Sequence, residues 1–371
     1  MIKKLLKEVS NIPGTGVKQK YVVIESDDWG SSRVDSPQMS AALKKAGYAI
    51  DKCWMSSYDA IERNNDLEAL FGVLESNRDK NGNAAVFTML FNPANPDFEK
   101  IREAGFSDYF YKPFTETLKN YNGTDKVPAL YQEAINGKLT AIEFHGREHL
   151  YTGRWLRDLR NGKKVALEGF GLGFWGFSKS YVPDLVRNYR PAFDLDTPED
   201  IPSQEQAIRE GAGLIGELFN ISPRFFVAPD GPYSLKLNKA LADSGIKYIG
   251  LSKSHLEPQG DHTTKKLYFH IGKTINHGLT VLTRNAIFEP GKRNGTDWVA
   301  SCLKDMESAF RWNKPAVIST HRANYIGVHS ADFRDKNLKD LDVLLKSILK
   351  KWPDAQFITS AELGAMIENK K

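Results

Sequence analysis

The feature that most constrains the fold is an alternation, along the chain, of short β-rich runs and helical patterns. Several of the β-rich runs are apolar throughout, as are strands buried on both faces of a parallel sheet. Apolar residues at spacings of three and four predict amphipathic helices between them. We expect strands at 21–26, 85–90, 140–144, 224–228, 248–251, 280–283, 316–319 and 356–358. We expect helices at 38–46, 66–76, 205–219, 235–244, 298–312 and 338–351, and a short last helix from Ser360.

Seven or eight βα units in one chain favour an α/β fold whose parallel strands form a closed or nearly closed barrel. An open doubly wound sheet is the alternative. We expect residues 1–371 to form one domain. The βα rhythm is lost at about 151–202, which we interpret as an insertion. Its stretch rich in glycine and aromatic residues, 169–177, forms either a sugar-stacking lid or a segment that buries its own aromatic side chains.

Charge and hydropathy exclude several classes of protein. The net charge is +5 and the charges are interspersed, without the like-charge runs typical of nucleic-acid arms. No stretch approaches the roughly 18 apolar residues of a membrane span. The first residues lack the apolar core of a signal peptide, so we expect a cytoplasmic protein. The two cysteines are too few for a disulfide framework.

Polar and ionisable residues follow the predicted strands at the point where each strand ends. In a (β/α) barrel the carboxyl ends of the strands meet on one face, which carries the chemistry. We therefore expect the following side chains to converge there: Asp27 and Asp28 after the first strand, His145 and His149 after the third, Asp230 after the fourth, Arg284 after the sixth and His321 after the seventh.

Two pairs among these residues indicate a metal site. Adjacent strand residues point to opposite faces, but where the chain turns at a strand end both Asp27 and Asp28 can reach the cavity. A spacing of four places His145 and His149 on one side of a helical turn, within reach of a single cation. Asp28, His145 and His149 would then be the three ligands of a zinc-type site with one open position. Alternatively, the aspartates belong to a turn and the histidines are structural.

The same residues resemble the motifs of the polysaccharide deacetylase family, the NodB homology domain of carbohydrate esterase family 4. Ser26-Asp27-Asp28 resembles its first motif, T-F-D-D, and His145-Gly146-Arg147-Glu148-His149 its second, H-[ST]-x-x-[HD]. Phe226-Val227-Ala228-Pro229-Asp230-Gly231 resembles the third, R-x-P-x-G preceded by an aromatic residue, and Ser319-Thr320-His321 the last, L-x-H. The motifs occur in the family's order, between about 21 and 325.

The resemblance implies a distorted (β/α) barrel and a metal-dependent carbohydrate deacetylase, a hydrolase of carbon–nitrogen bonds other than peptide bonds. A cation on Asp28, His145 and His149 would activate a water that attacks the carbonyl of an acyl group, foremost an N-acetyl group. Asp27 would be the base, and His321 the acid that protonates the leaving amine. Zinc suits these ligands, with cobalt, nickel, manganese and iron as alternatives.

The implied substrate is a carbohydrate, and without a secretion signal we expect a sugar or glycan precursor made inside the cell. Asp230 and Arg284 are further pocket residues. Trp29, Tyr233 and Trp175 would stack on a sugar ring if they do not belong to the core.

The chain departs from the family at several positions. Ser26 replaces a phenylalanine, and Gly146 replaces a hydroxyl residue. Val227 stands where the family has the arginine that steadies the catalytic aspartate, and we expect Arg284 to supply that charge from another strand. The fourth motif, D-x-x-D-W, is matched only in composition, by Asp297-Trp298. No carboxylate that would keep His321 charged is identified.

Two other functions remain open at this point. One is a metal-independent glycoside hydrolase on a related barrel, with Asp27 and Asp230 as its pair of carboxylates. The other is a non-catalytic carbohydrate-binding protein, which the loss of the family arginine at Val227 favours.

Overall fold

A parallel sheet organises the computed structural model, which describes residues 8–183 and 185–370. In this part of the chain the sheet follows the order β10-β7-β6-β5-β2-β1-β12-β11, and β13 pairs with the start of β1. Every pairing in it is parallel, so the fold class is α/β. The strands are β1 (Tyr21–Trp29), β2 (Phe87–Phe91), β5 (Thr140–Phe144), β6 (Phe225–Val227), β7 (Tyr248–Gly250), β10 (Thr280–Leu282), β11 (Ala286–Ile287), β12 (Ala316–His321) and β13 (Gln356–Phe357).

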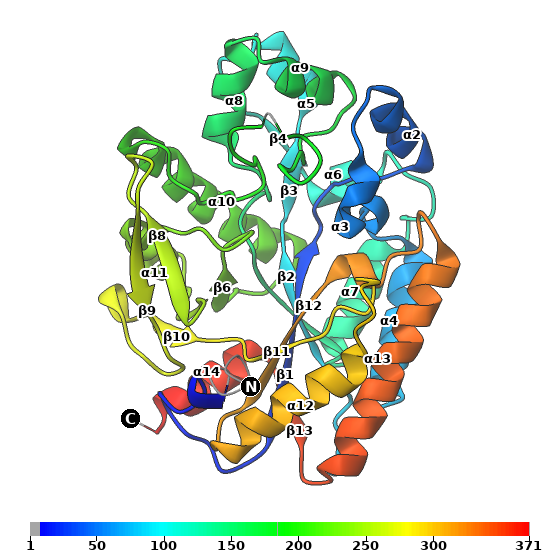
Figure 1. The fold of residues 1–371 in the computed structure, drawn as a ribbon, viewed down its shortest axis with the longest axis vertical. Helices are drawn as coiled ribbons and strands as arrows, with labels where there is room; N and C mark the ends of the chain where they lie inside the picture. Colours follow the sequence, from blue (N-terminus) through cyan, green and yellow to red (C-terminus); the bar gives the residue numbers. More distant parts are fainter. Residues whose placement is uncertain (1–7, 184, 371) are drawn as a thin grey trace.

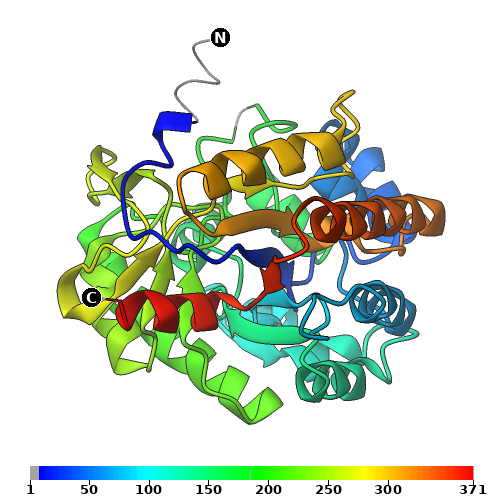
Figure 2. The same cartoon turned by 90° about the horizontal axis from the view of Figure 1, so that it is seen from below.

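The sheet curls back on itself. Its two outermost strands, β10 and β11, are separated in sequence by residues 283–285 only, which span at most about 11 Å. Within the described residues no ladder joins these two strands, so the barrel is left open at this seam. The last helix, α14 (Ser360–Glu368), contacts both β1 and β10 across the amino ends of the strands (Figures 1 and 2).

Helices surround the sheet (Figure 2). The helices α12, α13, α4 and α7 form a row in which each contacts the next, and α10 with α11 lies against the β5 side. The main core between helices and sheet is apolar, with Phe87, Phe91, Tyr131 and Phe226 among its buried rings. The helices are α2 (Pro37–Lys45), α3 (Trp54–Tyr58), α4 (Asn64–Glu75), α5 (Phe98–Glu103), α6 (Phe114–Leu118), α7 (Val127–Asn136), α8 (Thr152–Arg160), α9 (Lys164–Gly171), α10 (Ile201–Phe219), α11 (Asn238–Asp243), α12 (Trp298–Arg311) and α13 (Ala331–Lys351).

All eight predicted strands coincide with strands of the sheet, with ends that differ by a few residues. The elements not expected from the sequence are the antiparallel pair β3–β4 (Ala94–Pro96, Tyr111–Pro113), which has α5 between its strands, the antiparallel hairpin β8–β9 (Ser254–Pro258, Thr264–Tyr268), the strand β11, and the helices α3 and α5–α9. Most of these elements are short, so their apolar periodicity has too few residues to stand out.

The expected insertion at 151–202 contains α8, α9 and a largely irregular segment that leads into α10. Its aromatic side chains bury one another in a second core, which includes Trp155, Phe170, Phe174, Trp175 and Phe177 and also takes in residues from α2. This segment therefore buries its own aromatic side chains, which is one of the two alternatives.

No helix in residues 8–183 and 185–370 combines the length and apolarity needed to cross a membrane. The sequence predicts that the N-terminus carries no signal peptide. Residues 1–7, on which this prediction falls, lie outside the described residues.

Candidate active site

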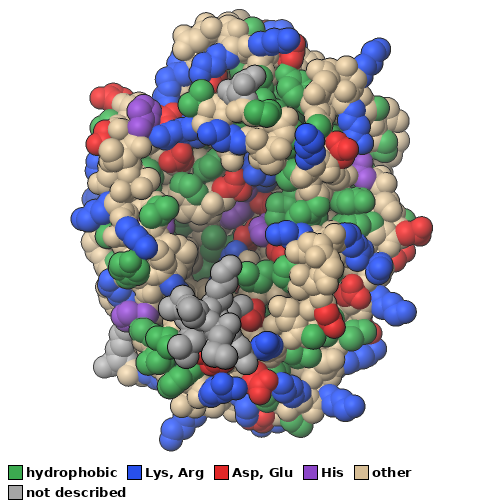
Figure 3. All heavy atoms as spheres, viewed as in Figure 1, with side chains coloured by type: hydrophobic (Ala, Val, Ile, Leu, Met, Phe, Trp, Pro, Cys, Tyr) green, Lys and Arg blue, Asp and Glu red, His purple; other side chains and the backbone are tan. Residues whose placement is uncertain are grey.

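A cavity of about 590 Å³ opens at the carboxyl ends of the strands, and Figure 3 shows the hollow with histidine and acidic side chains on its floor. Every residue expected from the strand-end argument lines it. The lining consists of Asp27, Asp28, His145, His149, Val227, Ala228, Asp230, Gly231, Gly250, Leu251, Ser252, Lys253, Arg284 and His321.

An irregularity in β1 lets two adjacent aspartates face the same cavity. The pairing of β1 with β2 shifts register between Ser26 and Trp29, and Asp28 has a φ of 80°. Non-glycine residues rarely adopt this left-handed conformation, and such strain concentrates at functional sites. The bulge breaks the strand alternation, so both Asp27 and Asp28 line the cavity.

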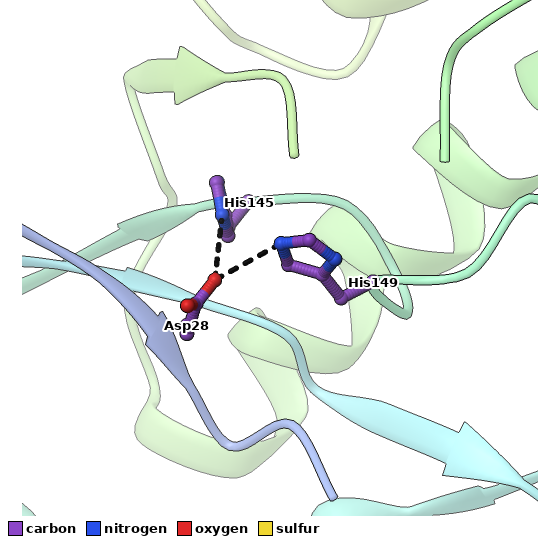
Figure 4. A group of neighbouring side chains, drawn as sticks. All are labelled: Asp28, His145 and His149. Atoms are coloured by element: carbon purple, nitrogen blue, oxygen red, sulfur yellow. Dashed lines mark ion pairs between the residues drawn. The ribbon is translucent and has the colours of Figure 1, made fainter. Parts of the chain in front are cut away.

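Asp28, His145 and His149 form a buried cluster whose potential ligand atoms all lie within 4.8 Å of one another. One carboxylate oxygen of Asp28, Oδ1, lies 3.0 Å from His149 Nε2 and 3.5 Å from His145 Nε2 (Figure 4). The Nδ1 of His145 is 2.8 Å from the carbonyl oxygen of Val227. If this nitrogen donates to the carbonyl, Nε2 carries the free lone pair, the arrangement that second-sphere partners impose on metal-binding histidines.

The buried Nε2 of His145 has no hydrogen-bond partner among the described residues. A buried nitrogen without a partner is costly, and a metal ion between the three side chains would satisfy it. Two imidazoles and one carboxylate are a common donor set for a divalent transition metal with open positions. The residues present therefore fit a metal ion.

The charge states of the cluster also suit a metal. Burial, with the positive charge of Arg33 second, lowers the pKa of His149 to about 4, so its imidazole is neutral at pH 7. Burial alone would raise the pKa of the Asp28 carboxyl, but contacts with His149 and Arg33 hold it well below its ordinary value. Neutral imidazole and ionised carboxylate are the states in which these groups bind metals.

The segment from His145 to His149 is a bend and not the helical turn that the spacing predicted. Gly146 has a φ of +94°, and a Cβ there would lie 3.0 Å from the Phe193 ring and 3.1 Å from the Glu148 carbonyl oxygen. The backbone at this position therefore requires glycine. Asn92, which the sequence analysis did not single out, donates from Nδ2 to the carbonyls of His145 (2.8 Å) and Gly146 (3.0 Å).

Arg284 forks onto Asp27, with Nη1 and Nη2 at 2.7 and 2.5 Å from its two carboxylate oxygens, and Nε lies 2.6 Å from Glu25. Burial would raise the pKa of Asp27, but the charge and hydrogen bonds of Arg284 lower it below its ordinary value. The expected contact between Arg284 and Asp27 is thus observed, with the arginine on the segment that joins β10 to β11.

Glu289 supplies the missing partner of His321. Its Oε1 lies 2.6 Å from His321 Nδ1, and its Oε2 accepts a hydrogen bond from Asn324 at 2.8 Å. Burial would lower the pKa of His321, but Glu289 and then Asp27 raise it to about 10. Nε2 of His321 faces Asp27 at 3.8 Å. Glu289 lies next to a strand of two residues, β11, which is too short to recognise from the sequence.

Two expectations need correction. Trp29 and Tyr233 are fully buried in the main core, where Trp29 donates to Ser26 and Tyr233 to Asn238, so neither ring faces the cavity. Asp297 is the N-cap of α12 and accepts from the Ala300 backbone, so Asp297-Trp298 does not form the missing motif. Asp230 does line the cavity, and its Oδ2 lies 3.3 Å from Arg190 Nε.

Comparisons with known proteins find similarity in structure only. No family model matches the sequence, and no curated protein matches it. A candidate polysaccharide deacetylase from Mycobacterium smegmatis aligns with a TM-score of 0.45 at 12% identity, over 96% of this chain and 95% of that one. A second such candidate, from Pseudomonas aeruginosa PAO1, gives 0.48 at 8% identity over 95% and 92%.

The 4-alpha-glucanotransferase of Thermococcus litoralis gives 0.48 at 10% identity, over 95% of this chain and 40% of that one. At these TM-scores and identities, the similarities are too low to assign an activity.

Proposed function

We propose that this protein is a metal-dependent hydrolase that removes an acyl group, foremost an N-acetyl group, from a sugar or glycan precursor. One observation carries the proposal. The Nε2 atoms of two buried histidines, His145 and His149, converge on one oxygen of Asp28, and that of His145 has no other partner. Asp27, Arg284 and His321 line the same cavity, and Glu289 contacts His321 at Nδ1.

Asp28, His145 and His149 would hold a divalent cation, with zinc the first candidate. When bound, the cation would supply Lewis acidity toward the acyl oxygen and lower the pKa of a water. Asp27 would accept the proton of the attacking water, because Arg284 keeps the carboxylate ionised. His321 would donate a proton from Nε2 to the leaving nitrogen, because Glu289 holds its Nδ1 side and keeps the ring protonated.

The pocket supports this proposal more than the two alternatives. A glycoside hydrolase built on Asp27 and Asp230 would leave the unpaired His145 Nε2 without an explanation. Asp27 has a lowered pKa and His321 a raised pKa, and the two side chains lie 3.8 Å apart. Such a pair is typical of acid–base catalysis and is not required for binding alone. That the substrate is made in the cytoplasm and that the chain forms one domain both stay predictions.

The metal content of the purified protein tests the proposal, measured by elemental mass spectrometry. We expect about one transition metal per chain after incubation with Zn²⁺, Co²⁺ or Ni²⁺, and none in the double variant His145→Ala, His149→Ala. His262→Ala, at an exposed position outside the cavity, is the matched control and should keep the metal.

Metal-loaded protein should then release acetate from N-acetylated sugars. If the wild-type protein binds none of the three metals, the deacetylase mechanism is wrong and the two alternatives return.

A further inference from the structure

A small side pocket of about 70 Å³ adjoins the main cavity. The two share Asp28, Asp230 and His321 as lining residues, so a molecule held at Asp28 and His321 can reach into both. The lining of the side pocket also includes two arginines, Arg33 and Arg190. Neither arginine moves a proton in the proposed chemistry, although the charge of Arg33 helps to keep His149 neutral and Asp28 ionised.

Arg33 is buried and poorly satisfied. Its side chain is 9% exposed, and its guanidinium lies 4.9 Å from the centre of the Trp175 ring. It approaches Asp28 and Asp59 only at 3.4 Å, and its Nε has no hydrogen-bond partner in the described part of the chain. Arg322, by contrast, holds the same Asp59 with a hydrogen bond of 3.0 Å from Nε.

Arg190 shows the same pattern. Its Nε lies 3.3 Å from Asp230 and lacks a hydrogen-bond partner among residues 8–183 and 185–370. Two other arginines of the insertion are fully engaged: Arg154 donates to Asp194 at 2.6 Å, and Arg157 to Asp200 at 2.6 Å. The chain can therefore satisfy an arginine in this segment, and at Arg190 it does not.

We infer that Arg33 and Arg190 form a subsite for a compact anionic group, a carboxylate or a phosphate, carried by the acylated substrate. Guanidinium groups match both anions in a fork geometry. Val34, Met55 and Phe174 make part of the pocket wall apolar, which strengthens the attraction, and the carboxylates of Asp28, Asp59 and Asp230 in the same lining offset part of the arginine charge. The inference rests on the proposed function for the identity of the reacting group, and it narrows the substrate from carbohydrate in general to an acidic acylated sugar.

Binding to zinc-loaded full-length protein tests the subsite by calorimetry. The probes are neutral N-acetylglucosamine, N-acetylmuramic acid with a carboxylate, and N-acetylglucosamine 6-phosphate. We expect at least one acidic probe to bind at least tenfold more tightly than the neutral one, and the tighter of the two identifies the anion. Arg190→Met should reduce this preference at least tenfold, and Arg190→Lys should retain part of it.

Arg209→Met removes an exposed arginine outside both cavities and should keep the preference. Equal binding of all three probes overturns the inference, as does a preference that survives Arg190→Met. Should Arg190→Met fail to fold, the same comparison is made with Arg190→Lys, whose unchanged preference would likewise overturn it.

Acetate release separates the two proposals. Release from neutral and acidic sugars alike, without any dependence on Arg190, supports the deacetylase and overturns the subsite. Binding of an acidic sugar that depends on Arg190, without release from any probe, supports the subsite and overturns the deacetylase.

Discussion

The two sides of the cavity differ in how their charges are satisfied. On the strand side, Asp27 and His321 each have a close hydrogen-bonded partner of opposite charge, Arg284 and Glu289. On the outer side, formed by Arg33 and Arg190 with the buried Trp175 ring packed against Arg33, both arginines keep an unpaired Nε. Groups that must hold one protonation state are fixed by the protein itself, whereas the two guanidinium groups approach carboxylates only at 3.3–3.4 Å and have hydrogen-bonding capacity left for a ligand. We therefore expect substitutions on the strand side to affect the rate, and those on the outer side to affect the choice of substrate.

The largest effect is expected for Asp27→Asn on the strand side. An amide cannot accept the proton of the attacking water, so kcat should fall by about 10²–10⁴-fold. Metal content should stay near that of the wild type, because Asp28 and not Asp27 belongs to the ligand cluster. Acetate release and elemental analysis measure the two effects.

The matched control for Asp27→Asn is Asp297→Asn, which changes a helix cap outside the cavity and should keep the rate. Near-normal turnover in Asp27→Asn would remove Asp27 from the mechanism and erase the difference between the two sides.

The strand side could largely be predicted from the sequence, and the outer side could not. Asp27, Asp28, His145, His149 and His321 follow short, largely apolar runs that predict strands, so the barrel rule places them on one face. The same rule erred for Trp29 and Tyr233, because a residue at a strand end can turn its ring into the core.

The residues that sequence reasoning missed come from irregular segments. Arg33, Arg190 and Glu289 lie outside the helices and long strands, so their positions depend on tertiary packing. The irregularity of β1 at Asp28 leaves no pattern in the sequence either. A carboxylate within reach of His321 could be required by chemistry, but only the fold shows that it is Glu289.

The second prediction concerns the pH dependence that Glu289 imposes. The pKa of His321 is raised to about 10, so the ring stays protonated at neutral pH and loses its proton as the pH rises through that value. Glu289→Gln removes the raising charge while burial, which lowers the pKa, remains. The alkaline limb of kcat/KM should therefore move to lower pH, with a loss of about tenfold at a fixed alkaline pH for each unit of pKa lost.

A pH profile of kcat/KM from pH 5 to 11 measures this shift, with the exposed Glu116→Gln as the control. An unmoved alkaline limb would mean that Glu289 does not set the charge of His321.

The third prediction tests the backbone that carries the histidine ligands. In Gly146→Ala the φ of +94° and the close approach to Phe193 and Glu148 should destabilise the fold by about 1–3 kcal/mol and weaken metal binding. Gly245→Ala is the matched control, because its φ is +88° and nothing lies within 4 Å of the added Cβ. Urea denaturation of both variants separates the strain they share from the steric contact specific to Gly146. Equal losses in the two would show that the packing against Phe193 relaxes freely.

The smallest effect is expected on the outer side, for substitutions of Trp175. This ring lies under the Arg33 guanidinium at 4.9 Å and against His149, with ring centres 6.3 Å apart. A cation over an aromatic face gains about 0.5–2 kcal/mol, most over tryptophan. Trp175→Leu should therefore loosen Arg33 and reduce the preference for an acidic sugar a few-fold, whereas Trp175→Phe keeps a ring and should lose less. Calorimetry with the acidic and neutral sugars gives the preference of each variant. If both variants instead lost the metal and kept the preference, Trp175 would serve the ligand cluster through His149, and the division of the cavity into two sides would have to be redrawn at this residue.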